Sequence, residues 1–517
     1  MRTLVRDALV VDGSGEPGYT ADVGIVEGRI TFEPVRDAHV VESRGRVLCP
    51  GFIDMHAHSD VVLLTEPEHT AKVSQGVTLE VLGQDGLSFA PTDEPTRVVL
   101  RQQIAGWNGD CAEAGWDTVA DYLARLDEGI ACHAAYLVPQ GTLRLMVVGA
   151  DDRPATSAEI DAMCDLLAQG LSEGAFGMSS GLTYAPGMYA DDAELAALLR
   201  VVAEHGGYYS PHHRSYGAGA LEAYAEMIEL CERTGCPLHL THATLNFEPN
   251  RGRAPELVAM LDAALERGLD LTLDSYPYLA GATTLAALLP GWASSGGPTA
   301  VLERLADPEQ AQRIRHDVEV SGSDGCHGCV VDWSTVQVSG TSVPERAGTY
   351  VRDFEDAVGL LQADRLATSV LQHVGHEDNV RTIMRHRTHC GGSDAILVGE
   401  RPHPRAWGTF PRYLGHYVAQ GVLDLVEAVH HLTGRPASRL GLTDRGLVRE
   451  GHAADLVLLD PDRVRDTATY ADPRRQCEGI DEVWVAGESV VSDGRRTAAM
   501  PGRALRRRGS GRRGSSR

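Results

Sequence analysis

The stretch that decides the fold is Pro50–Asp60, with the sequence PGFIDMHAHSD. Its apolar residues up to Ile53 predict a short buried strand, and alternate side chains of a strand point to the same side. Asp54, His56 and His58 are therefore expected to project together from the end of this strand. Two imidazoles at this spacing can hold one metal ion at about 2.0–2.1 Å, although a His-x-His pair by itself also occurs on protein surfaces by chance.

Length and composition bound the kind of protein. With 517 residues, of which 43% are hydrophobic, the chain suffices for one large barrel and a small second domain. Its net charge of −25 argues against a nucleic-acid-binding body. No apolar run is long enough to span a membrane, no leader segment is evident, and the ten cysteines lack disulfide-framework spacing. We expect a cytoplasmic protein with a small-molecule substrate and neither a nucleic-acid nor a membrane partner; the oligomeric state stays open.

The chain divides into strand-rich ends and an alternating middle. Short strand-like runs separated by turn glycines fill residues 1–52 and return over residues 446–500, and we expect the two ends to pair into one small β-sandwich. Over residues 53–445, strands alternate with helices, which is typical of an α/β fold of the (β/α)8 TIM-like type. The strands predicted after the first one are 77–82, 133–138, 207–210, 238–241 and 270–274.

Two segments depart from this alternation. Residues 285–349 are rich in Gly, Pro and Ser, with a strand-like run at 329–333, and are expected to form an insertion or lid over the barrel mouth. Residues 501–517 carry arginines among Gly and Ser and predict a disordered basic tail. A nucleic-acid or membrane arm is the less favoured interpretation of this tail.

Metal-type residues follow several of the predicted strands. Catalytic residues of a TIM-like barrel lie at the C-terminal ends of its strands. Each of these residues alone has an ordinary explanation, such as a turn or a helix cap. Their joint occurrence at strand ends predicts a metal centre, with the candidates His56, His58, Asp85, His212 or His213, His242 and Asp394.

With these strands placed, the sequence resembles the amidohydrolase superfamily and, within it, the N-acyl-D-amino-acid deacylases (D-aminoacylases). The resemblance covers roughly residues 1–495 and implies a metal-dependent hydrolase barrel with a β-sandwich. It rests on an ordered series of motifs: 50–58, 75–91 (QGVTLEVLGQDGLSFAP), 177–187 (GMSSGLTYAPG), 274–278 (DSYPY), 392–394 and 401–415 (RPHPRAWGTFPRYLG).

The resemblance also implies a ligand set. His56, His58 and Asp394 would hold one ion, and His212 and His242 would hold a second, tightly bound zinc ion. His212 is preferred to its neighbour because the family has a Thr-His-x-Arg pattern here, which this chain matches from the histidine onward.

The bridging position departs from the family, which has a cysteine where this chain has Asp85. The carboxylated lysine that bridges two ions in many superfamily members is excluded, because the only lysine, Lys72, precedes the second strand. A carboxylate is a harder ligand than a thiolate, so the site is expected to accept Mn²⁺ or Co²⁺ as well as Zn²⁺, as one or two ions.

Substrate contacts carry over only in part. By resemblance, Tyr184 and Tyr276 contact the substrate and Arg405 binds its carboxylate, a role that suits the two parallel donors of a guanidinium. Thr244 and Ala282 stand where the family has a lysine and a serine that also contact the substrate. The acyl group and the side chain of the substrate therefore stay open.

The implied reaction is amide hydrolysis by metal-activated water, with Asp394 as general acid and base. An N-acyl-D-amino-acid deacylase is the first hypothesis, and its D-configuration rests on resemblance alone. A cyclic amidohydrolase, similar to hydantoinases and dihydropyrimidinases, is the second. A non-catalytic metal-binding relative is the third.

Overall fold

The structure is a computed structural model, and it describes residues 2–111 and 115–507. Its centre is a sheet of eight parallel strands in which each strand pairs with the next. The sheet closes into a barrel just beyond its first and last strands, where Ala57 and Ala395 form a parallel bridge. The predicted (β/α)8 barrel is confirmed. Its strands are β6 (Phe52–Asp54), β7 (Val77–Leu82), β8 (His133–Pro139), β9 (Gly177–Gly181), β10 (Tyr208–His212), β11 (Leu238–Leu240), β12 (Leu271–Ser275) and β16 (His389–Gly391).

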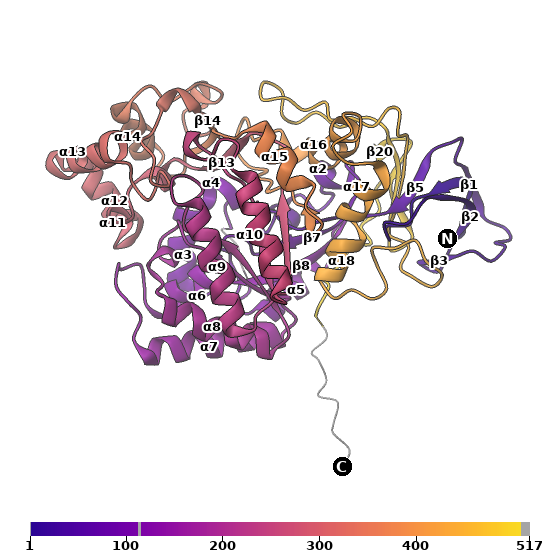
Figure 1. Ribbon diagram of the computed structural model, residues 1–517, viewed down its shortest axis with the longest axis horizontal. Coiled ribbons are helices and arrows are strands. Elements are labelled where there is room, and N and C mark those ends of the chain that lie inside the picture. Colours follow the sequence, from indigo (N-terminus) through magenta and orange to yellow (C-terminus); the bar gives the residue numbers. More distant parts are fainter. Residues whose placement is uncertain (1, 112–114, 508–517) are drawn as a thin grey trace, which may run out of the picture.

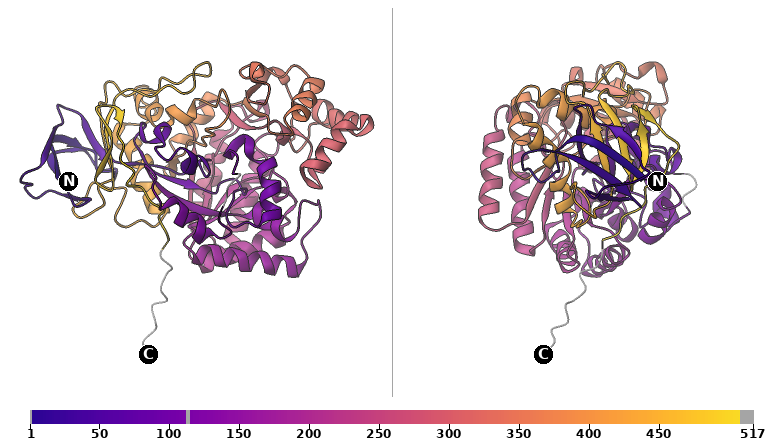
Figure 2. Two further views of the ribbon diagram at one scale, coloured as in Figure 1. Left: turned by 180° about the vertical axis from the view of Figure 1, so that it is seen from behind. Right: turned by 90° about the vertical axis from the view of Figure 1, so that its right-hand side faces the viewer.

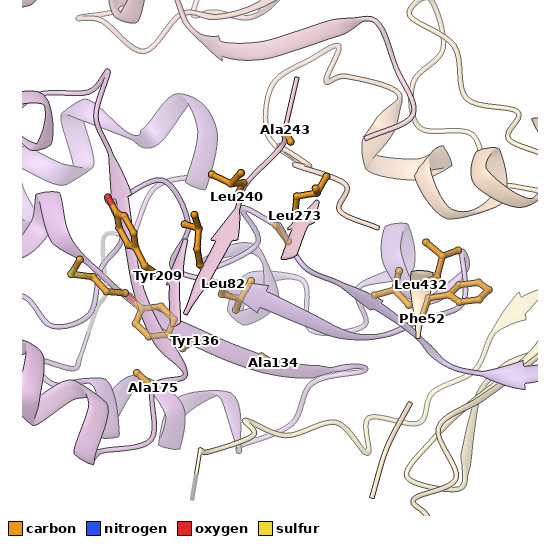
Figure 3. Packing of buried hydrophobic residues seen from close by; sticks show 14 of the residues in the cluster. Phe52, Leu82, Ala134, Tyr136, Ala175, Tyr209, Leu240, Ala243, Leu273 and Leu432 are labelled. Carbon is orange, nitrogen blue, oxygen red and sulfur yellow. The ribbon is translucent and has the colours of Figure 1, made fainter. Parts of the chain in front are cut away.

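Helices cover the outside of the barrel (Figure 1). In α9 (Ala220–Thr234) the buried residues Leu221, Tyr224, Ile228 and Cys231 recur at helical spacing and face the strands. The core between strands and helices includes large side chains such as Tyr136 and Tyr209 (Figure 3). Burying one large apolar side chain contributes about 1.5–3 kcal/mol, so this interface fixes the strand ends on which the site is built. No helix within the described ranges combines the length and the hydropathy that crossing a membrane requires.

Two barrel strands were not predicted from the sequence. β9 has the sequence GMSSG, which contains none of the β-branched or aromatic residues that usually mark a strand. β16 has only three residues. Both strands form because the backbone N–H and C=O groups of their neighbouring strands hydrogen-bond with them. This tertiary pairing overrides the weak local propensity for strand.

Strands from both chain ends pair with one another, as predicted, and they form one sheet of nine strands. β5 pairs antiparallel with β17, so that Val47 lies opposite Leu459. Side chains from both ends share one separate core around Trp484. In Figures 1 and 2 the indigo and yellow strands lie side by side at one end of the molecule. The strands are β1 (Arg2–Val10), β2 (Tyr19–Val26), β3 (Arg29–Thr31), β4 (His39–Glu42), β5 (Val47–Pro50), β17 (Leu456–Leu459), β18 (Ile480–Val485), β19 (Glu488–Ser492) and β20 (Arg495–Arg496).

The excursion between β12 and β16 lies at the opposite end of the molecule from this sheet (Figures 1 and 2). It has its own apolar core and a three-stranded sheet, and it is wider than the predicted insertion at 285–349. Residues 329–333 do not form the expected strand, because His327 and Gly328 turn the chain with positive φ angles of 56° and 74°. Its elements are β13 (Ala280–Thr284), α11 (Gly291–Ser294), α12 (Gly297–Ala306), α13 (Pro308–His316), β14 (Val336–Gly340), α14 (Phe354–Ala363) and β15 (Ser369–His373). We call residues 280–373 the lid.

The start of the basic tail is ordered, contrary to the prediction of disorder from residue 501. Gly502 forms a bridge with Ile130, and Ala504 forms one with Ala134 in β8. Arg506 adds an ion pair with Asp127 at 2.7 Å. These backbone and charge contacts offset the conformational entropy that residues 502–506 lose on ordering. A tail without such contacts would stay disordered. Residues 508–517 of the predicted tail lie outside the described residues.

Candidate metal centre

The first group of ligand-type side chains comes from the loops that follow β6 and β16. His56 Nε2 lies 3.3 Å from His58 Nε2, and His58 Nε2 lies 3.2 Å from Asp394 Oδ1. All three side chains are buried. The Asp394 N–H donates to the His56 carbonyl at 2.8 Å, which ties the two loops together. Facing imidazole nitrogens beside a carboxylate are a donor set suited to a divalent metal ion.

A second group lies beside the first, at the ends of β10 and β11. His212 Nδ1 lies 3.1 Å from His242 Nε2. Asp85, in the loop after β7, faces both groups: its Oδ1 lies 3.3 Å from His242 Nε2 and its Oδ2 lies 3.5 Å from His58 Nε2. Within each group the donor atoms lie within 4.8 Å of one another. The structure thus brings all six predicted ligands together and places Asp85 between the two groups.

Three of these residues have strained backbones. Asp85, His242 and Asp394 adopt positive φ angles of 55°, 30° and 49°. Such conformations cost about 1–3 kcal/mol for residues other than glycine and concentrate at functional sites. Their occurrence at three of the ligand-type residues indicates that this geometry serves the site rather than the stability of the barrel.

Neighbouring side chains orient the histidines. Thr183 Oγ1 lies 2.7 Å from His212 Nε2, which leaves His212 Nδ1 directed toward Asp85 and His242. Asp274, at the end of β12, accepts the His242 backbone N–H at 2.9 Å. Such outer contacts fix ring orientation and tautomer in metal sites. No role was predicted from the sequence for Thr183 or Asp274. A carboxylate at a strand end was an available signal for Asp274, whereas nothing in the sequence marks Thr183.

Two nearby residues are placed elsewhere. His213 packs against the rings of Tyr216 and Tyr224, each at a centroid distance of 4.0 Å, so His212 and not His213 joins the ligand group. The expectation that Asp54 projects together with His56 and His58 is wrong. β6 ends at Asp54, and its carboxylate turns to Lys72 and Ser393.

The predicted substrate residues surround the same centre. Arg405, at the start of α16 (Arg405–Arg412), is completely buried, and its guanidinium lies 4.5 Å above the ring of Tyr276. Its Nη1 lies 2.9 Å from Asp394 Oδ2 without hydrogen-bonding geometry, so its nitrogens keep unpaired donors. The Tyr184 ring lies 4.7 Å from that of His212. A cation and two aromatic rings therefore border the ligand groups.

Two adjoining cavities open from this centre toward the lid. One, of about 610 Å³, is lined by Asp85, Asp394, and lid residues that include His327. The other, of about 680 Å³, is lined mainly by apolar side chains such as Trp107 and Leu289. Tyr184 borders both. Neither Trp107 nor His327 was predicted at the site from the sequence, because both come from outside the barrel strands.

Electrostatics keeps both carboxylates ionised. Burial by itself raises the pKa of Asp85, but the surrounding histidines hold that pKa well below its usual range. Burial by itself also raises the pKa of Asp394. The Arg405 guanidinium and a hydrogen bond from His58 outweigh this effect, so the pKa of Asp394 lies below its usual value. Burial lowers the pKa of His58, yet the hydrogen bonds that its ring donates to the carboxylates of Asp394 and Asp85 bring that pKa up to about 10. Anionic oxygens and clustered imidazoles of this kind fit one or two divalent cations.

Comparisons with known proteins agree with this centre. The model of the amidohydrolase family matches residues 39–491. A D-aminoacylase from Alcaligenes xylosoxydans xylosoxydans is 33% identical, over 98% of this chain and 97% of its own. An N-acyl-D-glutamate deacylase from the same organism is also 33% identical, over 98% and 96%. The crystal structure of N-acyl-D-glutamate deacylase from Bordetella bronchiseptica, complexed with zinc and a phosphonate inhibitor, superposes with a TM-score of 0.83 at 30% identity and covers 98% of this chain and 99% of that one. The chain therefore belongs to the amidohydrolase family.

Proposed function

We propose that the protein is a metal-dependent hydrolase that cleaves the amide bond of N-acyl-D-amino acids to a carboxylate and a free D-amino acid. The observation that carries this proposal is the buried Arg405 guanidinium, whose unpaired donors lie beside Asp394 at the edge of the ligand groups. A buried cation with free donors suits the carboxylate of a substrate. The D-configuration is supported by the names of the relatives described above.

The proposed chemistry divides between the ion and the side chains. The two ligand groups would hold one or two divalent ions, which would supply a water molecule whose pKa is lowered from about 15.7 to about 7. Asp394 Oδ1 faces His58 and Oδ2 faces Arg405, so this carboxylate lies between the ligand groups and the carboxylate-binding cation. In the proposed reaction Asp394 accepts the proton of the water as the water oxygen adds to the acyl carbon, and it returns this proton to the nitrogen as the C–N bond breaks. Arg405 and Tyr276 hold the substrate so that this nitrogen lies within reach.

The two alternative functions have less support. A cyclic amidohydrolase of the carboxylated-lysine type needs a lysine at the metals, whereas Lys72 is buried against Asp54 and Glu80. A non-catalytic relative would not need the Asp394 and Arg405 pair. We also propose a cytoplasmic location, because all ten cysteines are unpaired, as is usual in a reducing compartment.

The decisive experiment measures the release of free amino acid from paired N-acetyl-D- and N-acetyl-L-amino acids. The enzyme is supplied with Zn²⁺, Mn²⁺ or Co²⁺ in turn. Turnover of the D-series alone is expected. Turnover of hydantoins or dihydropyrimidines without any open-chain activity would replace the proposal by the cyclic alternative.

The lining of the two cavities predicts a preference among D-amino acids. Neither cavity is lined by a lysine or an arginine in the described part of the chain, and Arg405, which lies beside Asp394 at the edge of the cavity of about 610 Å³, is already assigned to the first carboxylate. A second substrate carboxylate would therefore be buried without a counter-ion, at a cost of about 2–5 kcal/mol. We expect kcat/KM for N-acetyl-D-leucine to exceed that for N-acetyl-D-glutamate at least about 30-fold. Thr244→Lys, which places a cation in the lining, is expected to narrow this ratio, and equal rates for both substrates in the native enzyme would contradict the prediction.

The carboxylate of Asp85 is expected to shift the metal preference of the site from Zn²⁺ toward Mn²⁺. Oxygen ligands favour harder ions than thiolates do, and Asp85 faces both ligand groups. After dialysis against equal concentrations of Zn²⁺ and Mn²⁺, the Asp85→Cys variant is expected to hold at least about tenfold less Mn²⁺ relative to Zn²⁺ than the native protein. Elemental analysis of both proteins measures this ratio. The same ratio in both would show that Asp85 does not set the preference.

A further inference from the structure

Lys72 is the only lysine of the chain, and it is fully buried. It lies in the short helix α2 (Thr70–Val73), ahead of β7. Its Nζ donates to Asp54 Oδ2 at 2.7 Å and to Ser393 Oγ at 3.0 Å, and it forms an ion pair with Glu80. A buried ammonium ion is costly unless it is paired and hydrogen-bonded. All of its partners here belong to the strand ends and loops that build the metal centre, or to β7 beside them.

Asp54 connects Lys72 to the loop that carries Asp394. Asp54 Oδ1 accepts the backbone N–H groups of Ser393 at 2.8 Å and of His56 at 3.2 Å. Asp54 Oδ2 accepts the Ser393 hydroxyl at 2.5 Å. The Ser393 Oγ also lies 3.2 Å from the His56 carbonyl oxygen. One carboxylate therefore fixes both loops that carry the first ligand group.

Asp394 needs such support because its φ angle of 49° is unfavourable. It directly follows Ser393, whose backbone and hydroxyl are both held by Asp54. Without the ammonium ion, Asp54 and Glu80 would be two buried carboxylates with no lysine between them, and their repulsion would move Asp54 away from Ser393. We propose that Lys72 is a positioning residue: it holds Asp54 against Ser393 and thereby places the Asp394 carboxylate for proton transfer.

The other side of the lysine does not lead to the catalytic centre. Glu80 Oε2 lies 2.8 Å from His69 Nε2. Together with Cys132, these two residues form another group with metal-ligand chemistry. The positive charge that a metal would supply there already comes from Lys72. Glu80 thus offers a matched control, because it contacts Lys72 without contacting Ser393.

The test is a double-mutant cycle in the metal-loaded full-length enzyme, and it rests on the proposed deacylase activity. We expect Lys72→Met and Ser393→Ala each to lower kcat about 10- to 100-fold, per equivalent of bound metal, with KM changed by less than about threefold. The double variant is expected to be no worse than the poorer single variant, because both changes break the same connection. Glu80→Gln is expected to keep kcat within about threefold of the native value.

A second measurement does not depend on activity. Enzyme labelled with ¹³C at the lysine Cε gives one side-chain NMR signal, because Lys72 is the only lysine. Ser393→Ala is expected to shift this signal, since it removes a hydrogen-bond partner of Nζ. Ser393→Ala also keeps the proposal testable if Lys72→Met does not fold.

Several results would overturn the proposal. One is a double variant whose loss in kcat equals the product of the losses in Lys72→Met and Ser393→Ala. Another is a loss in kcat that disappears when kcat is expressed per bound metal. A third is a Ser393→Ala enzyme with native kcat. An effect of Glu80→Gln as large as that of Lys72→Met would also overturn it, because the role would then be general stability. Absence of turnover by the native enzyme would refute the deacylase function instead, so the two failures are distinguishable.

Discussion

Asp394→Asn is expected to retain metal and to lose about 10²- to 10⁴-fold in kcat, the range for removal of a general acid and base. Asparagine keeps an oxygen at the position that faces His58, so the first ligand group stays nearly complete. It cannot, however, accept a proton from water or return one to the leaving nitrogen. The measurement is kcat with N-acetyl-D-leucine, together with elemental analysis of the purified variant.

Asp60→Asn provides the matched control. Asp60 is another buried aspartate close to the site, and its carboxylate accepts the Gly83 N–H at 2.9 Å and the Ser88 hydroxyl at 2.6 Å. It belongs to neither ligand group. Its substitution is expected to cost less than about tenfold in kcat. A near-native Asp394→Asn enzyme would remove Asp394 from the proposed role.

Arg405→Ala is expected to raise KM for N-acyl-D-amino acids about 30- to 5,000-fold, which corresponds to the 2–5 kcal/mol cost of removing one partner of a buried charge pair. The KM for the matching amino-acid amides, which lack the carboxylate, is expected to change little. The comparison of the two substrate series is therefore more informative than the loss itself. Equal losses in both series would exclude the carboxylate-binding role.

Arg412→Ala serves as the control on the same helix. Arg412 forms an ion pair with Asp466 at 3.0 Å and lies over the Tyr278 ring. Arg412 is only partly buried, with 25% of its side chain exposed, and it forms no ion pair with Asp394, so its loss is expected to affect stability rather than KM. Arg405→Lys separates charge from shape, because lysine keeps the charge but lacks the two parallel donors.

The parts of the site that were predictable from sequence are those that depend on position along a strand. The barrel topology alone brings the carboxyl ends of the strands together, and six ligand-type residues lie at or just after such ends: His56, His58, Asp85, His212, His242 and Asp394. Alternation of strands and helices was likewise sufficient for the fold class. Local sequence did not mark β9, because it lacks strand-forming residues and depends on β8 and β10 for pairing.

Other features depend on contacts between segments far apart in the chain. Trp107 reaches the site from α4 (Ala105–Asn108) and stacks on His58, and His327 reaches it from the lid. The lid spans more of the chain than its turn-rich part because its outer strands, β13 and β15, lie beyond that part. The predicted direction of the Asp54 side chain was wrong because β6 ends at this residue, and the alternation of side chains along a strand does not continue beyond its end. Side-chain direction past a strand end is set by the loop and not by strand periodicity.

The pairing of β5 with β17 has a consequence for how the chain is made. Val47 leaves the ribosome early, whereas its partner Leu459 is synthesised near the end. At about 5–20 residues per second, roughly 20–80 s separate the two. During this interval β5 has an open edge, and such edges promote association between chains. The nascent protein is thus expected to complete its barrel first and to depend on chaperones until the second half of the small sheet arrives.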